Sequence, residues 1–266
     1  MKLRVFRTFR NCLLTVMLAV SLLATGCSVQ AAGEVGQLQQ LAKSCPEGST
    51  RASYASLDVS GSTPQDDIKK DREQALRDIV TRTAVCEGHL RVDAFTGSSA
   101  AGGVLYDSAF ELAGATEIAK MRTVSKVVDE AMATIDESLA AAATQLAATT
   151  GSDITSQFRR AAEYGTQMAE HEPILLTVDL MSDGAQNVGV VLESSLTTDE
   201  ALELAKKPSV VELPKDTVVK VSGLGKTTNP KPSSSYVEAL KVFYEAYCTR
   251  TGAARCSAVT EYTAGS

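Results

Sequence analysis

The residues of this chain that could act together chemically are oxygen-bearing side chains in the segment DVSGS, where Asp58, Ser60 and Ser62 alternate with small residues. An apolar stretch leads up to Asp58, and a proline and a helical pattern follow, so these side chains crowd a strand-to-helix turn. Three interpretations fit: a phosphoryl-accepting aspartate, a metal site, or an ordinary turn that caps the next helix. Because Asp and Ser are common in turns and caps, this segment alone does not decide between them.

Two further groups of oxygen side chains occur at similar junctions. Ser152 and Asp153 lie in GSDI, ahead of a helical pattern, and Asp183 lies in LMSDG, directly after a strongly apolar stretch. Hydroxyls and carboxylates without thiolate or imidazole suit a hard cation such as Mg²⁺, Mn²⁺ or Ca²⁺. The sequence therefore predicts a divalent-cation site, with Mg²⁺ preferred and with Thr150 as the substitute for Ser152.

The elements that must position these residues alternate between strands and helices. Strand patterns are predicted at residues 53–59, 90–94, 104–112, 174–181 and 218–221, and helical patterns at 65–84, 121–149, 154–168, 198–206 and 235–247. This alternation predicts an α/β fold: a doubly wound, mostly parallel central sheet with one antiparallel edge strand and helices on both faces. In such sheets the ligand site lies at the carboxyl ends of the strands.

The order of the three motifs resembles a known family. DVSGS, then GSDI ahead of a helix, then LMSDG after an apolar strand, is similar to a von Willebrand factor type A (vWA) domain with a metal-ion-dependent adhesion site. The resemblance covers most of the chain after its N-terminal segment and implies a Rossmann-like vWA fold. It implies that Asp58, Ser60 and Ser62 form the DxSxS turn and that Asp183 is the aspartate of the later motif. Ser152 stands where the family usually has threonine.

The resemblance also implies a function. The hydroxyls of Ser60, Ser62 and Ser152 would coordinate a divalent cation directly, while Asp58 and Asp183 would act largely through bound waters. Because few anionic groups touch the cation, it stays electrophilic, and a glutamate or aspartate of a protein partner fills its open position. The expected function is cation-dependent binding of a protein partner, without catalysis and without a small-molecule substrate.

Two enzyme classes and one non-enzymatic class compete with this interpretation. A haloacid-dehalogenase-like phosphatase needs a second aspartate two residues after Asp58, and Ser60 occupies that position. A serine hydrolase needs GxSxG and a histidine base, whereas the chain has no GxSxG and only His89 and His171, both in surface-like contexts. An envelope scaffold or assembly factor with a structural or degenerate metal site is the alternative that the sequence leaves open.

Residues 1–27 are predicted to be a targeting segment and not part of the fold. Basic residues precede an apolar run at residues 12–23, and ATGC ends at Cys27, which resembles the lipobox of bacterial lipoproteins. A plain secretory signal or a short membrane anchor are the alternatives. The lipobox predicts acylation of Cys27 and an exported protein held by lipid at the cell membrane or in the cell envelope. The expected organisation is a lipoprotein signal peptide at 1–27, a tether at 28–47 and a vWA-like domain at 48–266.

Net charge restricts the kind of partner, and chain length restricts the number of domains. The chain has 266 residues and a net charge of −6, and residues 1–27 carry four basic and no acidic side chains, so their removal lowers the net charge to −10. An acidic domain without clustered Lys and Arg is a poor nucleic-acid binder, so no nucleic-acid partner is expected. The remaining length suits a single domain with one sizeable core.

Four cysteines lie outside the N-terminal segment, at positions 45, 86, 248 and 256. An even number in an exported protein predicts two disulfides, for which three pairings exist. We favour Cys45–Cys86 and Cys248–Cys256, because each would tie the end of an element to its neighbour. Zinc binding is disfavoured because the chain has no CxxC spacing and only two histidines, and free thiols are the weaker alternative outside the cytosol.

Overall fold

The structure is a computed structural model of the chain that describes residues 33–60, 66–97, 102–147, 149, 151–227 and 231–262. It divides into two units, Met1–Gln37 and Leu38–Ser266, of which the second carries the fold. Helix α2 (Glu34–Ala42) crosses the boundary between them. None of the helices in the described part of the chain has the length and apolar character needed to cross a bilayer.

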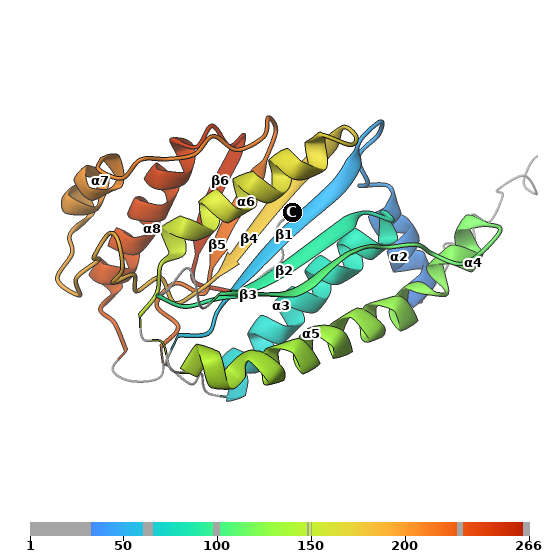
Figure 1. The fold of residues 1–266 in the computed structure, drawn as a ribbon, viewed down its shortest axis with the longest axis horizontal. Helices are drawn as coiled ribbons and strands as arrows, with labels where there is room; N and C mark the ends of the chain where they lie inside the picture. The colour runs from blue at the N-terminus through green and yellow to red at the C-terminus, as the bar shows by residue number, and fades with distance from the viewer. Residues whose placement is uncertain are drawn as a thin grey trace, which may run out of the picture. The chain divides into compact units, whose positions relative to one another are not determined.

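In the second unit the described residues form a six-stranded sheet (Figure 1). Its strands are β1 (Thr50–Asp58), β2 (His89–Phe95), β3 (Gly103–Ala109), β4 (Ile174–Met181), β5 (Val218–Ser222) and β6 (Arg255–Val259). Their order is β3-β2-β1-β4-β5-β6, and every neighbouring pair is parallel except β2 and β3, which pair antiparallel at one edge. This confirms the predicted α/β fold with a mostly parallel sheet and one antiparallel edge strand.

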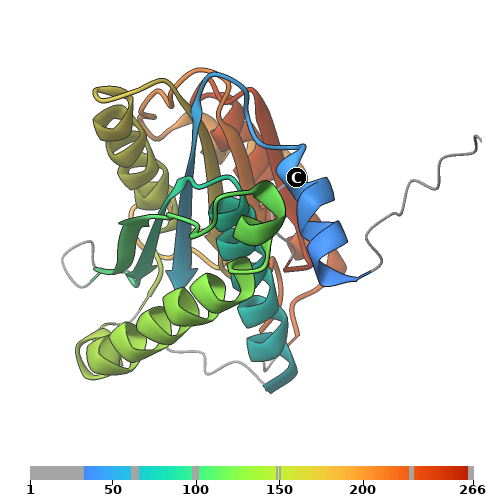
Figure 2. The same cartoon turned by 90° about the vertical axis from the view of Figure 1, so that its right-hand side faces the viewer.

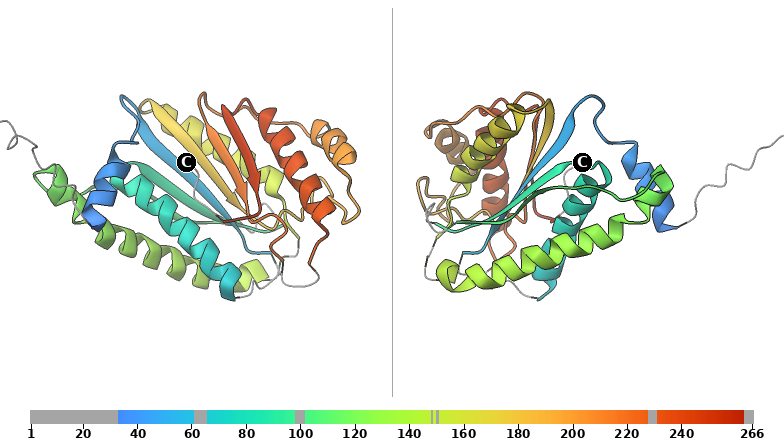
Figure 3. Two further views of the ribbon diagram at one scale, coloured as in Figure 1. Left: turned by 180° about the vertical axis from the view of Figure 1, so that it is seen from behind. Right: turned by 45° about the vertical axis from the view of Figure 1, so that its right-hand side comes forward.

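Helices cover both faces of this sheet. They are α3 (Asp66–Val85), α4 (Glu117–Met121), α5 (Val124–Ala147), α6 (Ile154–Ala169), α7 (Thr198–Lys206) and α8 (Ser234–Thr249). Figure 2 shows α6 on one side of the sheet and α3 on the other, and both views in Figure 3 show α5 running beside α3. On the α6 side, α8 packs against β6 and α7 packs against α8.

Strand β1 lies in the middle of the sheet because both of its faces are suited to close helix packing. Its alternate residues face opposite sides, as the period of a strand requires. Ser53 meets α3, where the Thr83 hydroxyl donates to the Ser53 hydroxyl at 2.7 Å. Ser56 faces α6 and donates to the Gln157 side-chain carbonyl at 2.9 Å. Small and mid-sized side chains on both faces let the helices approach, and most of the strand is buried.

The apolar core on the α6 side is continuous between the sheet and helices α6 and α8. Its largest side chains are aromatic: Tyr54, Phe158, Phe243 and Tyr244 are each less than 2% exposed. Phe158 of α6 meets Tyr247 of α8 in an edge-to-face contact, with ring centroids 5.0 Å apart. This packing fixes the first turns of α6 against the last turn of α8.

Two predicted boundaries differ from the observed ones for physical reasons. The helical pattern predicted at 121–149 is two helices, α4 and α5, because Arg122 ends α4 as its C-cap and the next helix begins at Val124. Strand β6 was not predicted at all. It has only five residues, and its weak apolar alternation gives no local signal until it pairs with β5.

Both predicted disulfides are present. Cys45 and Cys86 join the segment before β1 to the end of α3, and Cys248 and Cys256 join α8 to β6. Helix α2 and Cys45, one half of the first disulfide, fall within residues 28–47, the range predicted to be a tether, so regular structure begins before residue 48. Residues 1–32, including Cys27, lie outside the described residues.

Candidate metal centre

The candidate centre lies where the winding of the sheet reverses. The chain leaves β1 toward β2 on one side, while it leaves β4 toward β5 on the other, and β1 and β4 are neighbours. In open parallel sheets this switch point leaves a crevice at the carboxyl ends of the strands, where ligands bind. Asp58 is the last residue of β1, and Asp183 follows the end of β4 by two residues. The topology thus brings two of the predicted carboxylates to the same edge.

Three predicted oxygen ligands are in direct contact there. The Ser60 hydroxyl donates to Asp58 Oδ1 at 2.7 Å, and the Ser60 backbone N–H donates to the same oxygen at 3.0 Å. Ser60 Oγ lies 2.6 Å from Ser152 Oγ, although the two residues are 92 positions apart in the sequence. Because the Ser60 proton is directed to Asp58, the Ser152 hydroxyl is the donor to Ser60. The structure therefore brings Asp58, Ser60 and Ser152 together.

Ser182 is a further member of this cluster that the sequence analysis did not single out. Its hydroxyl donates to Asp58 Oδ2 at 2.6 Å and accepts the Gly184 backbone N–H at 3.0 Å. The side chain is 1% exposed, so the contact with Asp58 is protected from water. The signal that points to Ser182 is its position directly before Asp183, at the end of β4. Ser182 holds the second Asp58 oxygen and orients that carboxylate.

The turn that carries Ser152 is held by the loop after β4. The Ser152 backbone N–H donates to Asn187 Oδ1 at 3.0 Å, and the Ser152 carbonyl accepts from the Asn187 N–H at 3.2 Å. Gly151 has a φ of +91° and lies against the Asn187 side chain, so a larger residue would be both strained and obstructed. The next residue, Asp153, caps α6 by accepting the Ser156 N–H at 3.1 Å. GSDI is therefore a rigid turn that aims one hydroxyl at the site.

A buried glutamine makes a second link between these two loops. Gln186 is 1% exposed, accepts the Thr155 N–H at 2.9 Å and donates to the Thr155 hydroxyl at 2.9 Å. Neither Asn187 nor Gln186 belongs to a recognisable motif, and sequence reasoning missed both. Together they fix the loop after β4 to the first turn of α6.

Asp183 is partly buried at the other side of the cluster. Its Oδ1 accepts the Ala185 N–H at 2.9 Å, and its backbone carbonyl accepts the Gly225 N–H at 2.8 Å. Burial raises the pKa of the Asp183 carboxyl to about 6; the Ala185 hydrogen bond opposes this shift and the nearby charge of Asp58 adds to it. The loss of hydration and the like charge are both conditions that a bound cation would relieve.

The residues present fit a hard divalent cation. Asp58, Ser60 and Ser152 supply oxygens only, and the described part of the chain has no cluster of three or more His, Cys, Asp or Glu side chains that could hold a metal instead. Neighbouring ligands of an octahedral Mg²⁺ lie about 3 Å apart, and the two serine oxygens are a few tenths of an ångström closer than that. A cation would only have to separate these hydroxyls slightly.

The remaining predicted site residues are placed as follows. Ser62 and the substitute ligand Thr150 lie outside the described residues. His89 begins β2 at the opposite edge of the sheet, where its Nδ1 lies 3.0 Å from the Tyr164 hydroxyl. His171 follows the end of α6 and is exposed. Neither histidine lies at the carboxyl ends of β1 and β4, so neither contacts the serines of the cluster.

Comparison with known proteins finds no matching family model and no matching curated protein. Solved structures do match, and two of them illustrate how low the overall similarity is. The pilus adhesin SpaC from Lactobacillus rhamnosus GG, in its open conformation, has a TM-score of 0.37 and 9% identity over 75% of this chain and 27% of the adhesin. Proximal thread matrix protein 1 from the mussel byssus has a TM-score of 0.34 and 15% identity over 75% of this chain and 48% of the mussel protein.

The chain thus spans about a quarter of the adhesin and about half of the mussel protein. Similarities of this strength carry no functional argument, so the case for a function has to come from the site itself.

Proposed function

We propose that this protein binds a protein partner through a divalent cation held at the carboxyl ends of β1 and β4, in the manner of a vWA-type adhesion site, and that it does so without catalysis. The observation that carries the proposal is the convergence of Asp58, Ser60 and Ser152, which come from two distant segments. Asp183 adds a carboxyl from a third segment, and the charge of Asp58 contributes to the raised pKa of that carboxyl.

The charge of the donor set explains why such a site would bind a carboxylate. The oxygens of Ser60 and Ser152 are neutral, and Asp58 already accepts hydrogen bonds from Ser60 and Ser182. A divalent cation at this position would keep much of its positive charge and would supply an electrophilic site for an oxygen ligand. A glutamate or aspartate side chain of the partner provides that ligand. Binding of this kind needs no general acid or base.

We also propose that the protein is exported and lipid-anchored through Cys27. The basic start, the short apolar run and ATGC support this localisation. The two disulfides support it independently, because disulfides persist mainly in oxidising compartments. The lipid would hold the vWA-like domain at the cell membrane or envelope, where a partner on another molecule can reach it.

The cation is tested by titrating the full chain with MgCl₂ and MnCl₂ by calorimetry, with and without EDTA. We expect binding in the wild type, and at least tenfold weaker binding in Asp58→Asn, which keeps the size of the side chain. Asp78→Asn is the matched control, because Asp78 is an exposed α3 aspartate that contacts only Gln74 among the described residues. Equal affinities in wild type and Asp58→Asn would refute the cation site.

The anchor is tested by metabolic labelling with a radioactive or alkyne-bearing fatty acid in the producing cell. We expect wild-type chain to be labelled and to sediment with membranes. Cys27→Ser should be unlabelled and should either keep its N-terminal segment or leave the membrane fraction. Normal labelling of Cys27→Ser would overturn the lipid anchor while leaving the cation proposal untouched.

A second function is an envelope scaffold or assembly factor whose metal site is structural or degenerate. The observation in its favour is that the site oxygens satisfy one another: Ser152 donates to Ser60, and Ser60 and Ser182 donate to Asp58. The two functions differ in the chelator experiment. Loss of partner binding in EDTA, restored by Mg²⁺, supports the adhesion site, whereas unchanged partner binding in EDTA and in Asp58→Asn supports the scaffold.

A further inference from the structure

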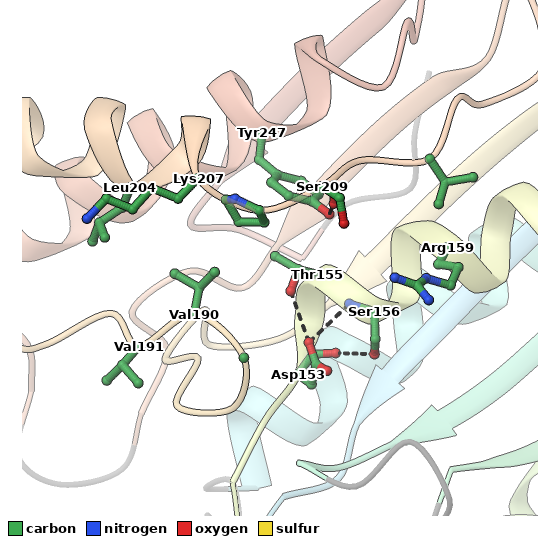
Figure 4. A pocket seen from close by; sticks show the side chains of 13 residues that line it. Asp153, Thr155, Ser156, Arg159, Val190, Val191, Leu204, Lys207, Ser209 and Tyr247 are labelled. Carbon is green, nitrogen blue, oxygen red and sulfur yellow. Dashed lines mark hydrogen bonds between the residues drawn. The ribbon is translucent and has the colours of Figure 1, made fainter.

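A hollow with a volume of about 580 Å³ opens at Asp153, the residue that follows Ser152 of the candidate metal centre (Figure 4). It lies between the first turns of α6, the loop after β4 and the end of α7, and Tyr247 of α8 contributes to its wall. This volume falls within the roughly 300–1,000 Å³ of pockets that bind small ligands or short peptide segments. None of the proposed cation ligands lines this hollow. Asp153, which caps α6, does line it and directly follows the proposed ligand Ser152.

The lining of the hollow combines polar and apolar side chains, and part of its apolar portion is exposed. Val190 and Val191 come from the loop after β4, Leu204 from α7, and Val211 from the segment that follows α7. Val191 is 47% exposed and Val211 is 38% exposed, and these are two of the five large apolar side chains that are exposed in the described part of the chain. Exposed apolar side chains gathered in a concave surface indicate a binding site more strongly than the same side chains scattered singly.

Two cationic side chains border this apolar surface. Arg159 of α6 and Lys207, which follows α7, lie on opposite sides of it and are both exposed (Figure 4). Neither makes an ion pair with a described residue, whereas many other cations of the chain do. Asp153 is the one acidic side chain among the lining residues, and its carboxylate is engaged by the Thr155 hydroxyl and the Ser156 N–H. In a chain with a net charge of −6, this is a local surplus of positive charge.

The hollow and the metal centre share their walls. Asp153 follows Ser152 directly, and the loop that holds Ser152 through Asn187 continues into Gly189 and Val191 at the hollow. A segment bound at the cation would therefore have neighbouring residues within reach of the hollow. Because Gln186 ties both walls together, the two sites keep a fixed relation to each other.

We propose that this hollow is a second docking subsite, which takes an aliphatic side chain of the protein partner together with an adjacent carboxylate. The aliphatic side chain packs on Val190, Val191 and Leu204, and the carboxylate pairs with Arg159 or Lys207. The identity of the occupant as the partner rests on the proposed function. The subsite makes recognition specific, because a cation alone would accept any exposed carboxylate.

The proposal is tested with the short peptide acetyl-Gly-Leu-Asp-Gly-amide, titrated into the ¹⁵N-labelled full chain in EDTA so that no cation can capture the carboxylate. We expect backbone amide shifts at residues 189–191, 204–211 and 155–159. The matched peptides with Asn in place of Asp, or Gly in place of Leu, should bind at least fivefold more weakly. Sodium octanoate is run alongside, and binding of octanoate without binding of the peptide would contradict a protein partner.

Two exposed variants sharpen the test without threatening the fold. The double variant Arg159→Glu with Lys207→Glu should lower peptide affinity at least tenfold. Arg122→Glu is the matched control, because Arg122 is exposed at the end of α4 and does not line the hollow. Equal affinity in the double variant and in wild type would overturn the proposal.

Failure of this inference can be told apart from failure of the proposed function. If Mg²⁺ binds and Asp58→Asn abolishes that binding, but the peptide gives no shifts at the hollow, the cation function stands and the subsite is wrong. If the peptide binds at the hollow but no cation binds, the subsite stands and the cation function is wrong.

Discussion

Two regions of this molecule surround aspartates with polar groups in opposite ways. Asp93 on β2 is completely buried and has its charge matched inside the protein: Arg91 Nε lies 3.0 Å from Oδ1, Arg160 Nη2 lies 2.7 Å from Oδ2, and the Tyr54 hydroxyl donates to Oδ2 at 3.0 Å. Among the described residues, the Asp58 carboxylate accepts from the neutral donors Ser60 and Ser182, whereas the Asp58 backbone carbonyl accepts from Arg72 Nη1 at 3.0 Å. No described lysine or arginine forms an ion pair with Asp58.

The contrast separates a structural aspartate from a candidate binding aspartate. Burial by itself would lower the pKa of Arg160. The charge and hydrogen bonds of the Asp93 carboxylate outweigh this effect, so the pKa of Arg160 is raised. At the carboxyl ends of the strands, burial and the like charge of Asp58 instead raise the pKa of Asp183 to about 6. The charge of Asp93 is balanced inside the protein, whereas the repulsion and burial at Asp183 would be relieved by the proposed cation.

The largest effect should come from removing the matched charge. In Asp93→Asn, two arginines lose their buried counter-charge, and we expect the free energy of unfolding to fall by about 3–5 kcal/mol, the usual cost of breaking a buried pair. Urea denaturation measures it. Asp107→Asn is the control, because Asp107 also pairs with Arg91 but has a side chain 38% exposed, and should cost under about 1 kcal/mol. A loss of cation affinity in Asp93→Asn with normal folding would contradict the assignment of Asp93 as a purely structural aspartate.

The second effect should fall on binding more than on folding. Asp58→Asn should weaken Mg²⁺ or Mn²⁺ binding by about 10- to 100-fold, the range seen when a supporting carboxylate of a metal site is removed. Its free energy of unfolding should fall by about 1.5–3 kcal/mol, less than in Asp93→Asn, because one hydrogen bond to the carboxylate is lost. Calorimetry and urea denaturation of the same sample check both. A stability loss as large as that of Asp93→Asn would mean that Asp58 is structural.

The third effect concerns Ser152, which supplies the middle hydroxyl of the proposed cation site. Ser152→Ala removes the middle hydroxyl and should weaken cation binding by about tenfold. Ser152→Thr keeps the hydroxyl and restricts its rotamers, so it should bind at least as tightly as wild type. Ser195→Ala, at an exposed position before α7, is the control. Unchanged affinity in Ser152→Ala would remove this hydroxyl from the ligand set.

The fourth effect is a pH dependence of the same site. A carboxyl whose folded pKa is raised to about 6 stabilises the metal-free fold at low pH, and this contribution is lost as the pH rises from about 4 through 6. Cation binding requires the ionised form, so affinity should be constant above pH 7 and about tenfold weaker at pH 5. In Asp183→Asn this dependence should disappear. Equal affinities at pH 5 and pH 7 in wild type would contradict it.

The smallest effect tests whether the Asp93 network and the candidate metal centre are independent of each other, although residues of β1 take part in both. Tyr54 donates to Asp93 and to Gln157, and Gln157 also accepts from Ser56, two residues before Asp58. Tyr54→Phe should reduce the free energy of unfolding by about 1 kcal/mol, the value of a lost buried hydrogen bond. Cation affinity should stay within twofold of wild type. A larger change would show that the two regions are coupled through Gln157.

The two regions also differ in how far the sequence predicted them. Asp58, Ser60, Ser152 and Asp183 were all named from three short motifs, because each motif lies at the end of a strand or the start of a helix. The Asp93 network was not predicted, because Arg91 and Asp93 alternate with apolar residues in β2 and Arg160 follows Arg159 in α6, so all three look like solvated side chains in a linear pattern. Ser182 and Asn187 were missed for the same reason: their roles depend on residues more than thirty positions away.

The sequence by itself determined most of the element types, the α/β class with its antiparallel edge, both disulfides and the oxygen side chains that end the strands. Local periodicity and motif chemistry are sufficient for those. Only the tertiary structure decided that β1 and β4 are neighbours, that β6 exists, and that Ser60 meets Ser152 across 92 positions of sequence. The physical reason is that strand order and loop docking follow from packing between distant segments, which no local pattern contains. The hollow at Asp153, with Arg159 and Lys207 at its border, is likewise a product of three distant segments.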